Sequence, residues 1–123
     1  MANDDNYVTR GELIRMLQSW QAGELTTQQL WDWASHRFQA GQADYDDWDG
    51  EDSVAREVLT MLDSLDLHLM LVEDVPLHLA FLQSPLGAFW ESQSDWHAKL
   101  AELNYAERRV SLKDDPIYAL YCE

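Results

Sequence analysis

The sequence has little of the material on which several common activities depend. Its 123 residues include a single cysteine, Cys122, which excludes an internal disulfide and fits a reducing compartment. The 5 glycines leave little material for a phosphate-binding loop. The motifs G-x-S-x-G, Walker A and G-x-G-x-x-G are absent. We therefore expect a protein that is not an enzyme.

Basic residues are also scarce. There are 8 lysines and arginines against 23 aspartates and glutamates, for a formal net charge of −15 at pH 7. Nucleic-acid binding relies on lysine and arginine to neutralise phosphates, and anionic membrane surfaces repel such a chain. We expect neither nucleic acid nor a membrane as a partner. The same field attracts basic proteins.

Long hydrophobic runs are missing as well. The uninterrupted apolar runs are short, as in Leu69–Val72, and cannot span a bilayer. The start at residues 1–5 lacks the positive region and apolar core of a signal peptide. Together with the cysteine content, these features predict a cytoplasmic protein.

The hydrophobic fraction of 46% is ordinary for a folded protein, despite the acidity. The length fits one domain, and no repeat or linker divides it. The pattern predicts an all-α fold: one domain over residues 1–123, built as a bundle of about five helices with a docked C-terminal segment. The polar residues 1–8 are expected to be flexible.

Capping signals mark the first two helices. Thr9 and Glu12 match a capping box, and Gly23 ends the first helix. Thr26 caps a second helix that Gly41 ends. The connection between them is short, so the two helices should form an antiparallel hairpin.

Three more helices are predicted beyond residue 50. The third begins at Asp52 or Ser53 and stops near Asp66, and residues 67–72 form an extended connection. Pro76 lies in the first turn of a fourth helix, which is apolar nearly all round and therefore buried.

The fifth helix should begin with Ser84 as its cap and Pro85 at its first position, with an interruption near residues 92–95. Residues 116–121 are too apolar for a free tail and are expected to dock as a turn or short helix. The tryptophans expected in the core are Trp20, Trp33, Trp90 and Trp96.

An acidic stretch at residues 44–52 precedes the third helix. As a calcium loop it fails, because setting Gly50 at position 6 places Tyr45 at position 1 and Arg56 at position 12, where carboxylates are needed. The four histidines show no zinc spacing. We therefore predict no metal and no cofactor.

The stretch has two remaining interpretations, a solvated loop or a recognition surface. In the second, the carboxylates steer a basic partner, and Tyr45, Trp48 and Trp31 supply apolar anchors. The predicted partner-binding residues are Asp44, Tyr45, Asp46, Asp47, Trp48, Asp49, Glu51, Asp52 and Trp31.

A basic cluster near the C-terminus consists of Arg108, Arg109 and Lys113. In so negative a chain it is expected to pair with the chain's own acids, or with carbonyl groups at a helix end, rather than with phosphate.

The segment Leu17-Gln18-Ser19-Trp20-Gln21-Ala22-Gly23-Glu24-Leu25-Thr26-Thr27 leads one helix through Gly-Glu-Leu-Thr into an aromatic-rich second helix. With the acidic third segment, it resembles the small bacterial immunity proteins of the colicin type. The resemblance implies a cytoplasmic inhibitor that covers a basic toxin domain, usually a nuclease.

The first hypothesis is therefore an acidic module that neutralises or escorts a basic protein, such as a nuclease-type toxin. The alternatives are a structural or adaptor domain, whose acidity serves solubility, and a metal-dependent enzyme.

Overall fold

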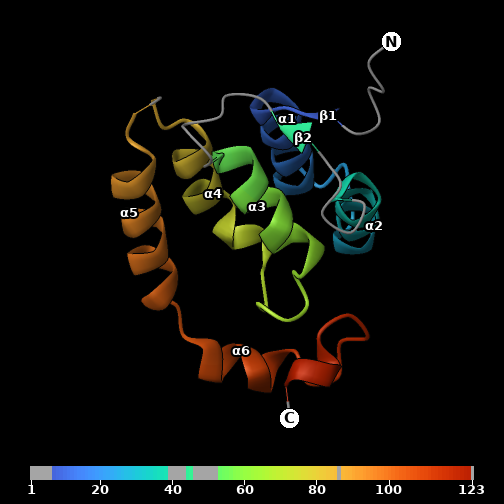
Figure 1. Cartoon of the computed structure of the whole chain (residues 1–123). Helices are drawn as coiled ribbons and strands as arrows, with labels where there is room; N and C mark the ends of the chain where they lie inside the picture. The colour runs from blue at the N-terminus through green and yellow to red at the C-terminus, as the bar shows by residue number, and fades with distance from the viewer. Residues whose placement is uncertain (1–6, 39–43, 46–52, 86, 123) are drawn as a thin grey trace.

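A computed structural model describes residues 7–38, 44–45, 53–85 and 87–122. Helices dominate these residues, which confirms the predicted all-α class (Figure 1). A two-residue parallel pair, β1 (Tyr7–Val8) with β2 (Asp44–Tyr45), is the one sheet among them. The α-helices are α1 (Arg10–Gln21), α2 (Thr27–Phe38), α3 (Val54–Asp63), α4 (Val75–Leu82), α5 (Phe89–Ala101) and α6 (Tyr105–Ser111). Two short 3-10 helices are η3 (Val72–Asp74) and η4 (Ala119–Tyr121).

The first three helices begin at their predicted caps. The Thr9 hydroxyl accepts from the backbone N–H of Glu12 at 3.0 Å. Thr26 and Gln29 form a reciprocal capping box, with distances of 2.9 and 3.1 Å. At α3, the predicted alternative Ser53 is the cap, and its hydroxyl accepts from the N–H three residues further on.

The contribution of the Ser53 cap to stability can be measured by substitution. Ser53 is fully buried, so Ser53→Ala is expected to lower the free energy of unfolding by about 1 kcal/mol. Urea unfolding followed by circular dichroism measures the change. Ser94→Ala on the exposed side of α5 is the control and should shift stability by less than about 0.5 kcal/mol. An equal effect of the two substitutions would show that the cap does not stabilise α3.

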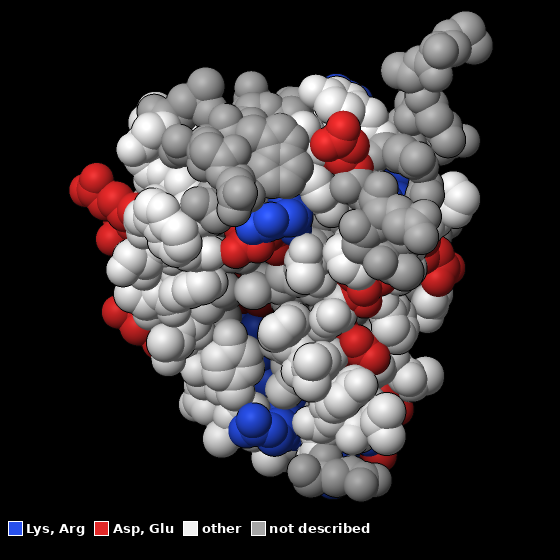
Figure 2. All heavy atoms as spheres, viewed as in Figure 1, with Lys and Arg blue, Asp and Glu red and all other residues white. Residues whose placement is uncertain are grey.

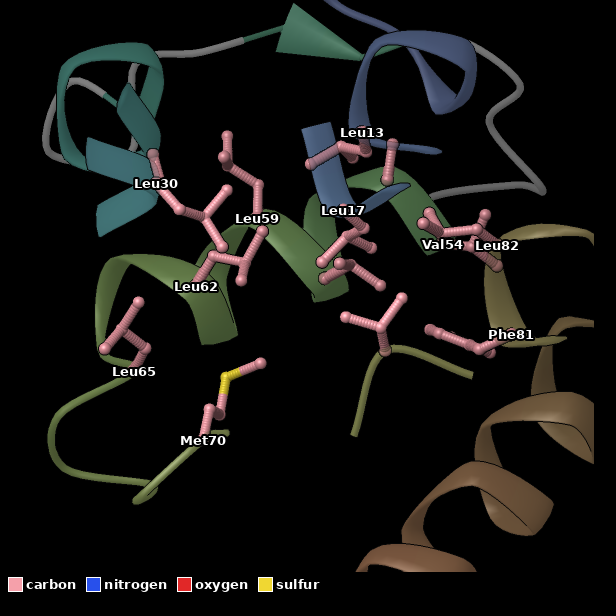
Figure 3. Close-up of a cluster of buried hydrophobic side chains, with 14 of the residues drawn as sticks. Leu13, Leu17, Leu30, Val54, Leu59, Leu62, Leu65, Met70, Phe81 and Leu82 are labelled. Carbon is pink, nitrogen blue, oxygen red and sulfur yellow. The ribbon is translucent and has the colours of Figure 1, made fainter. Parts of the chain in front are cut away.

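The core lies where α1, α2, α3 and α4 meet (Figure 3). Side chains from α1, α2 and α3 point toward one another there, and α4 closes the other side with Phe81 and Leu82. The prediction of a buried, apolar α4 is therefore confirmed. The fully buried leucines include Leu13, Leu17, Leu30, Leu59, Leu62 and Leu65.

The fifth helix differs from its prediction at its start and in its middle. Ser84 does not cap it: the Ser84 hydroxyl donates to the Phe81 carbonyl at 2.6 Å and so completes the end of α4. Helix α5 begins only at Phe89. The polar residues 92–95 lie inside it without an interruption, because the helix buries only one side.

The tryptophans divide differently from the prediction. Trp20 and Trp96 are buried, as expected, and Trp33 is half-buried against the core. Trp90 was expected in the core but is 69% exposed. It follows Phe89 directly in α5, and the roughly 100° step between neighbours turns it away from the side that Phe89 buries.

The connection before α4 is folded rather than extended. Turns run through residues 64–69, and Leu69 has a φ of 51°, in the left-handed region.

Helix α6 was not predicted. The Asn104 side chain caps it by accepting from the N–H of Glu107 at 3.0 Å.

The two ends of the described chain are both anchored. Residues 1–8 were expected to be flexible; of these, Val8 in β1 is fully buried and pairs with Tyr45, and Tyr7 pairs with Asp44. At the other end, Tyr118 is buried and its hydroxyl donates to the Met70 carbonyl. The predicted docking of the C-terminal segment is thereby confirmed.

Candidate interaction surface

Two of the predicted partner-binding anchors point into the protein. Tyr45 is 4% exposed, because β2 pairs with β1 and carries the ring inward; burial raises the pKa of its phenol. Trp31 is half-buried, and its indole N–H donates to the Asp63 carbonyl at 2.9 Å. Tyr45 and Trp31 thus hold β2 and the α2–α3 contact in place. The expectation of an exposed anchor is wrong for Tyr45, whereas the role of the half-buried Trp31 in binding stays a prediction.

The rest of the predicted site divides into one described residue and six that are not. Asp44 is exposed, and its carboxylate accepts from the N–H of Tyr45 at 3.0 Å. The remaining predicted residues lie outside the described residues and stay predictions; they are Asp46, Asp47, Trp48, Asp49, Glu51 and Asp52. Most of the segment compared with a calcium-binding loop also lies outside the described residues.

Several arginines are occupied by structural contacts. The Arg37 guanidinium donates to the Tyr7 carbonyl at 2.7 Å and to the Glu12 carboxylate at 2.7 Å, which joins α2 to β1 and α1. Arg10 donates to the carbonyls of Leu82 and Ser84 at the end of α4. These charges help to satisfy backbone groups inside the fold instead of lying on its surface.

Arg108 is the deepest of these cations, at 8% exposure. Its guanidinium donates to both oxygens of Asp74 at 2.7 Å, to the Leu69 carbonyl at 3.1 Å and to Glu73 at 3.4 Å. The hydrogen bonds with Asp74 raise the pKa of Arg108. The prediction that this cluster pairs with the chain's own acids is confirmed for Arg108.

The carboxylates, in contrast, remain largely on the outside. Figure 2 shows acidic side chains over α5 and along the opposite edge, whereas a group of basic ones lies toward the end occupied by α6. Exposed acids without an ion pair among the described residues are Glu24, Asp32, Asp44, Glu91, Asp95, Glu102, Glu107 and Asp114. Arg15, Lys99, Arg109 and Lys113 are exposed as well, so the described surface carries both signs of charge, with carboxylates in excess.

Helix α5 presents a second combination of acids and an aromatic side chain. Glu91, Asp95 and the C-cap residue Glu102 are exposed along it, and the exposed Trp90 lies at its N-terminal end. Trp90 was expected in the core, so this face was not among the predicted partner-binding residues. The signal that identifies it is the spacing of the acids, which puts all three on one side of a helix.

The hollows on the surface are small. The hollow between η3 and α6 measures about 270 Å³, the one between α3 and α5 about 160 Å³, and the one between α4 and α5 about 120 Å³. Small-molecule sites usually occupy about 300–1,000 Å³.

His78 is a buried titratable group. It is fully buried on α4, and its Nδ1 accepts from the Trp96 indole N–H at 3.1 Å. Its Nε2 has no hydrogen-bond partner among the described residues. Burial lowers the pKa of His78 to about 4, although Asp74 acts in the opposite direction. At neutral pH the ring is therefore uncharged, with its proton on Nε2.

Within the described ranges, no group of three or more histidine, cysteine, aspartate or glutamate side chains is placed to hold a metal ion. The described helices are too short or too polar to cross a membrane.

Comparisons with protein-family models, with curated proteins and with solved structures found no match for this chain.

Proposed function

We propose that this chain is a binding protein for a basic protein, which it neutralises or escorts in the cytoplasm. The observation that carries the proposal is the excess of exposed carboxylates over exposed lysines and arginines among the described residues, while Arg37 and Arg108 are held by ion pairs within the fold. Such a field attracts a cationic surface over about a Debye length and accelerates its association.

The acidity of the chain exceeds what solubility alone requires. A net charge of −15 exceeds the magnitude of about 2–8 that suffices to keep a small domain soluble, and it opposes folding through self-repulsion. A basic partner that covers the carboxylates relieves this repulsion, so binding and stability are coupled.

The resemblance to colicin-type immunity proteins favours one kind of partner, a nuclease-type toxin. A surface that binds the phosphates of nucleic acid is rich in lysine and arginine. An acidic protein of this size can cover such a surface, because it presents negative charge as the nucleic acid does. Inhibition of a nuclease is therefore the version of the function that we propose first.

Affinity capture from the cells that encode the protein tests this function. The immobilised chain is expected to retain a basic protein with 1:1 stoichiometry, to release it as salt is raised, and to inhibit it if it is a nuclease. A purified partner should bind with a Kd of about 1 μM or tighter at physiological salt. Recovery of no stoichiometric basic protein would contradict the proposal and leave the adaptor alternative.

A further inference from the structure

The outer side of α5 carries both charged side chains and an exposed aromatic ring. Helix α5 lies at the edge of the molecule beside α4, on the side away from α2 (Figure 1). Its inner side buries Phe89 and Trp96. We call its opposite side, with the C-cap residue Glu102, the outer face; it is exposed and includes Trp90, Glu91, Ser94, Asp95, Ala98, Ala101 and Glu102.

Trp90 is an apolar side chain placed for contact. It is 69% exposed, yet its ring stands edge-on to that of the buried Phe89, with centroids 5.3 Å apart. The contact limits the rotamers of the indole, so a partner would order it at little entropic cost. Tryptophan is among the residues most enriched in binding hot spots, and its face also attracts the cations of lysine and arginine.

The three acids of the outer face lie on the same side of the helix. A step of about 100° per residue puts Glu91, Asp95 and Glu102 within an arc of about 40°. None of the three forms an ion pair among the described residues. Lys99, the one lysine or arginine in α5, is exposed one turn from Asp95, and both side chains line the hollow beside α4. Ala98 and Ala101 have short side chains, which let another backbone approach closely.

We propose that the outer face of α5 is the surface on which a helix of the basic partner docks. Lysine or arginine side chains of that helix would pair with Glu91, Asp95 and Glu102, and an apolar side chain would pack on Trp90. Charge complementarity selects a cationic occupant, and the exposed indole selects one that also carries apolar area. The inference rests on the proposed function, and it assigns the contact to α5 instead of to Tyr45 and Trp31.

A synthetic helical peptide with lysine and arginine on one face and leucine on the other serves as the probe. Its Kd is measured by fluorescence anisotropy with the full chain at fixed ionic strength. Four variants are compared. The first is Glu91→Gln with Asp95→Asn and Glu102→Gln, and its charge-matched control is Glu24→Gln with Asp32→Asn and Asp114→Asn. The other two are Trp90→Ala and Trp90→Phe. All control positions are exposed, and both triple variants carry the same net charge.

The α5 triple variant is expected to weaken binding about tenfold or more, and the control triple less than about threefold. Trp90→Ala should weaken it about tenfold and Trp90→Phe much less. In an NMR titration, the Trp90 indole N–H should shift more than the other indoles. Equal weakening by the two triples overturns the α5 assignment but leaves the proposed function standing. No binding of the peptide by the unaltered protein overturns the assignment, and affinity capture then tests the function separately.

Discussion

Asp74→Ala is expected to lower the free energy of unfolding by about 3–5 kcal/mol, the largest single effect that we predict. The substitution leaves the Arg108 guanidinium buried with two of its hydrogen bonds lost. It also removes the acceptor for the N–H of Leu71 at the start of η3. A buried charge without its partner is costly, because the low-dielectric interior does not solvate it. Urea unfolding at neutral pH measures the loss.

Glu73→Ala is the matched control. Glu73 contacts the same guanidinium at 3.4 Å, but its side chain is 67% exposed, so its removal should cost less than about 1 kcal/mol. The double variant Asp74→Leu with Arg108→Met should be more stable than Asp74→Ala, since it leaves no unpaired charge. If Asp74→Ala and Glu73→Ala had equal effects, the buried ion pair of Asp74 in η3 with Arg108 in α6 would not be what stabilises this contact.

Acid is expected to destabilise the protein through His78. The pKa of His78 is about 4 when folded and 6.5 ordinarily, so below pH 6.5 the unfolded chain takes up a proton that the folded chain does not. The contribution is fully present above pH 6.5 and is lost as the pH falls toward 4. The difference corresponds to about 3 kcal/mol at most. Urea unfolding at a series of pH values from 7.5 to 4 measures it.

His78→Asn isolates this contribution. The asparagine oxygen can accept from the Trp96 indole in place of Nδ1, and it does not titrate. The variant should be less stable at pH 7.5, since it loses part of the packed ring, but its stability should fall less steeply below pH 6.5. His68→Asn is the control. Partial burial also lowers the pKa of His68, but much of its side chain contacts solvent, so its effect on stability should be smaller. Parallel curves for the unaltered protein and His78→Asn would contradict the assignment.

The features predicted well from the sequence are those fixed by local chemistry. The caps at Thr9, Thr26 and Ser53 depend on residues within one turn, and the structure has all three. The buried α4 follows from an apolar pattern that leaves it no polar side. The error at α5 arose because Ser84 and Pro85 resemble a helix start, whereas the Ser84 hydroxyl bonds backward to the end of α4.

The candidate site was harder to predict, because exposure is decided by distant partners. Tyr45 is buried through its pairing with β1, and Trp31 through a carbonyl of α3, each more than thirty residues away. Angular position on a helix does not reveal such contacts. The engagement of Arg108 followed from the charge balance, although Asp74 as its partner did not. Trp90 was misassigned because α5 meets the body along only one side.

The central claim is that exposed carboxylates capture a basic protein. Its most direct test is the association rate constant of the captured partner, measured by stopped flow from about 0.02 to 0.5 M salt. The account predicts a fall of about tenfold or more for the unaltered protein. It also predicts a slower and flatter dependence when Asp46, Asp47, Asp49 and Glu51 are replaced by Asn and Gln, or when the α5 triple variant is used. A rate constant that does not change with salt, or that is equal in all variants, would contradict it.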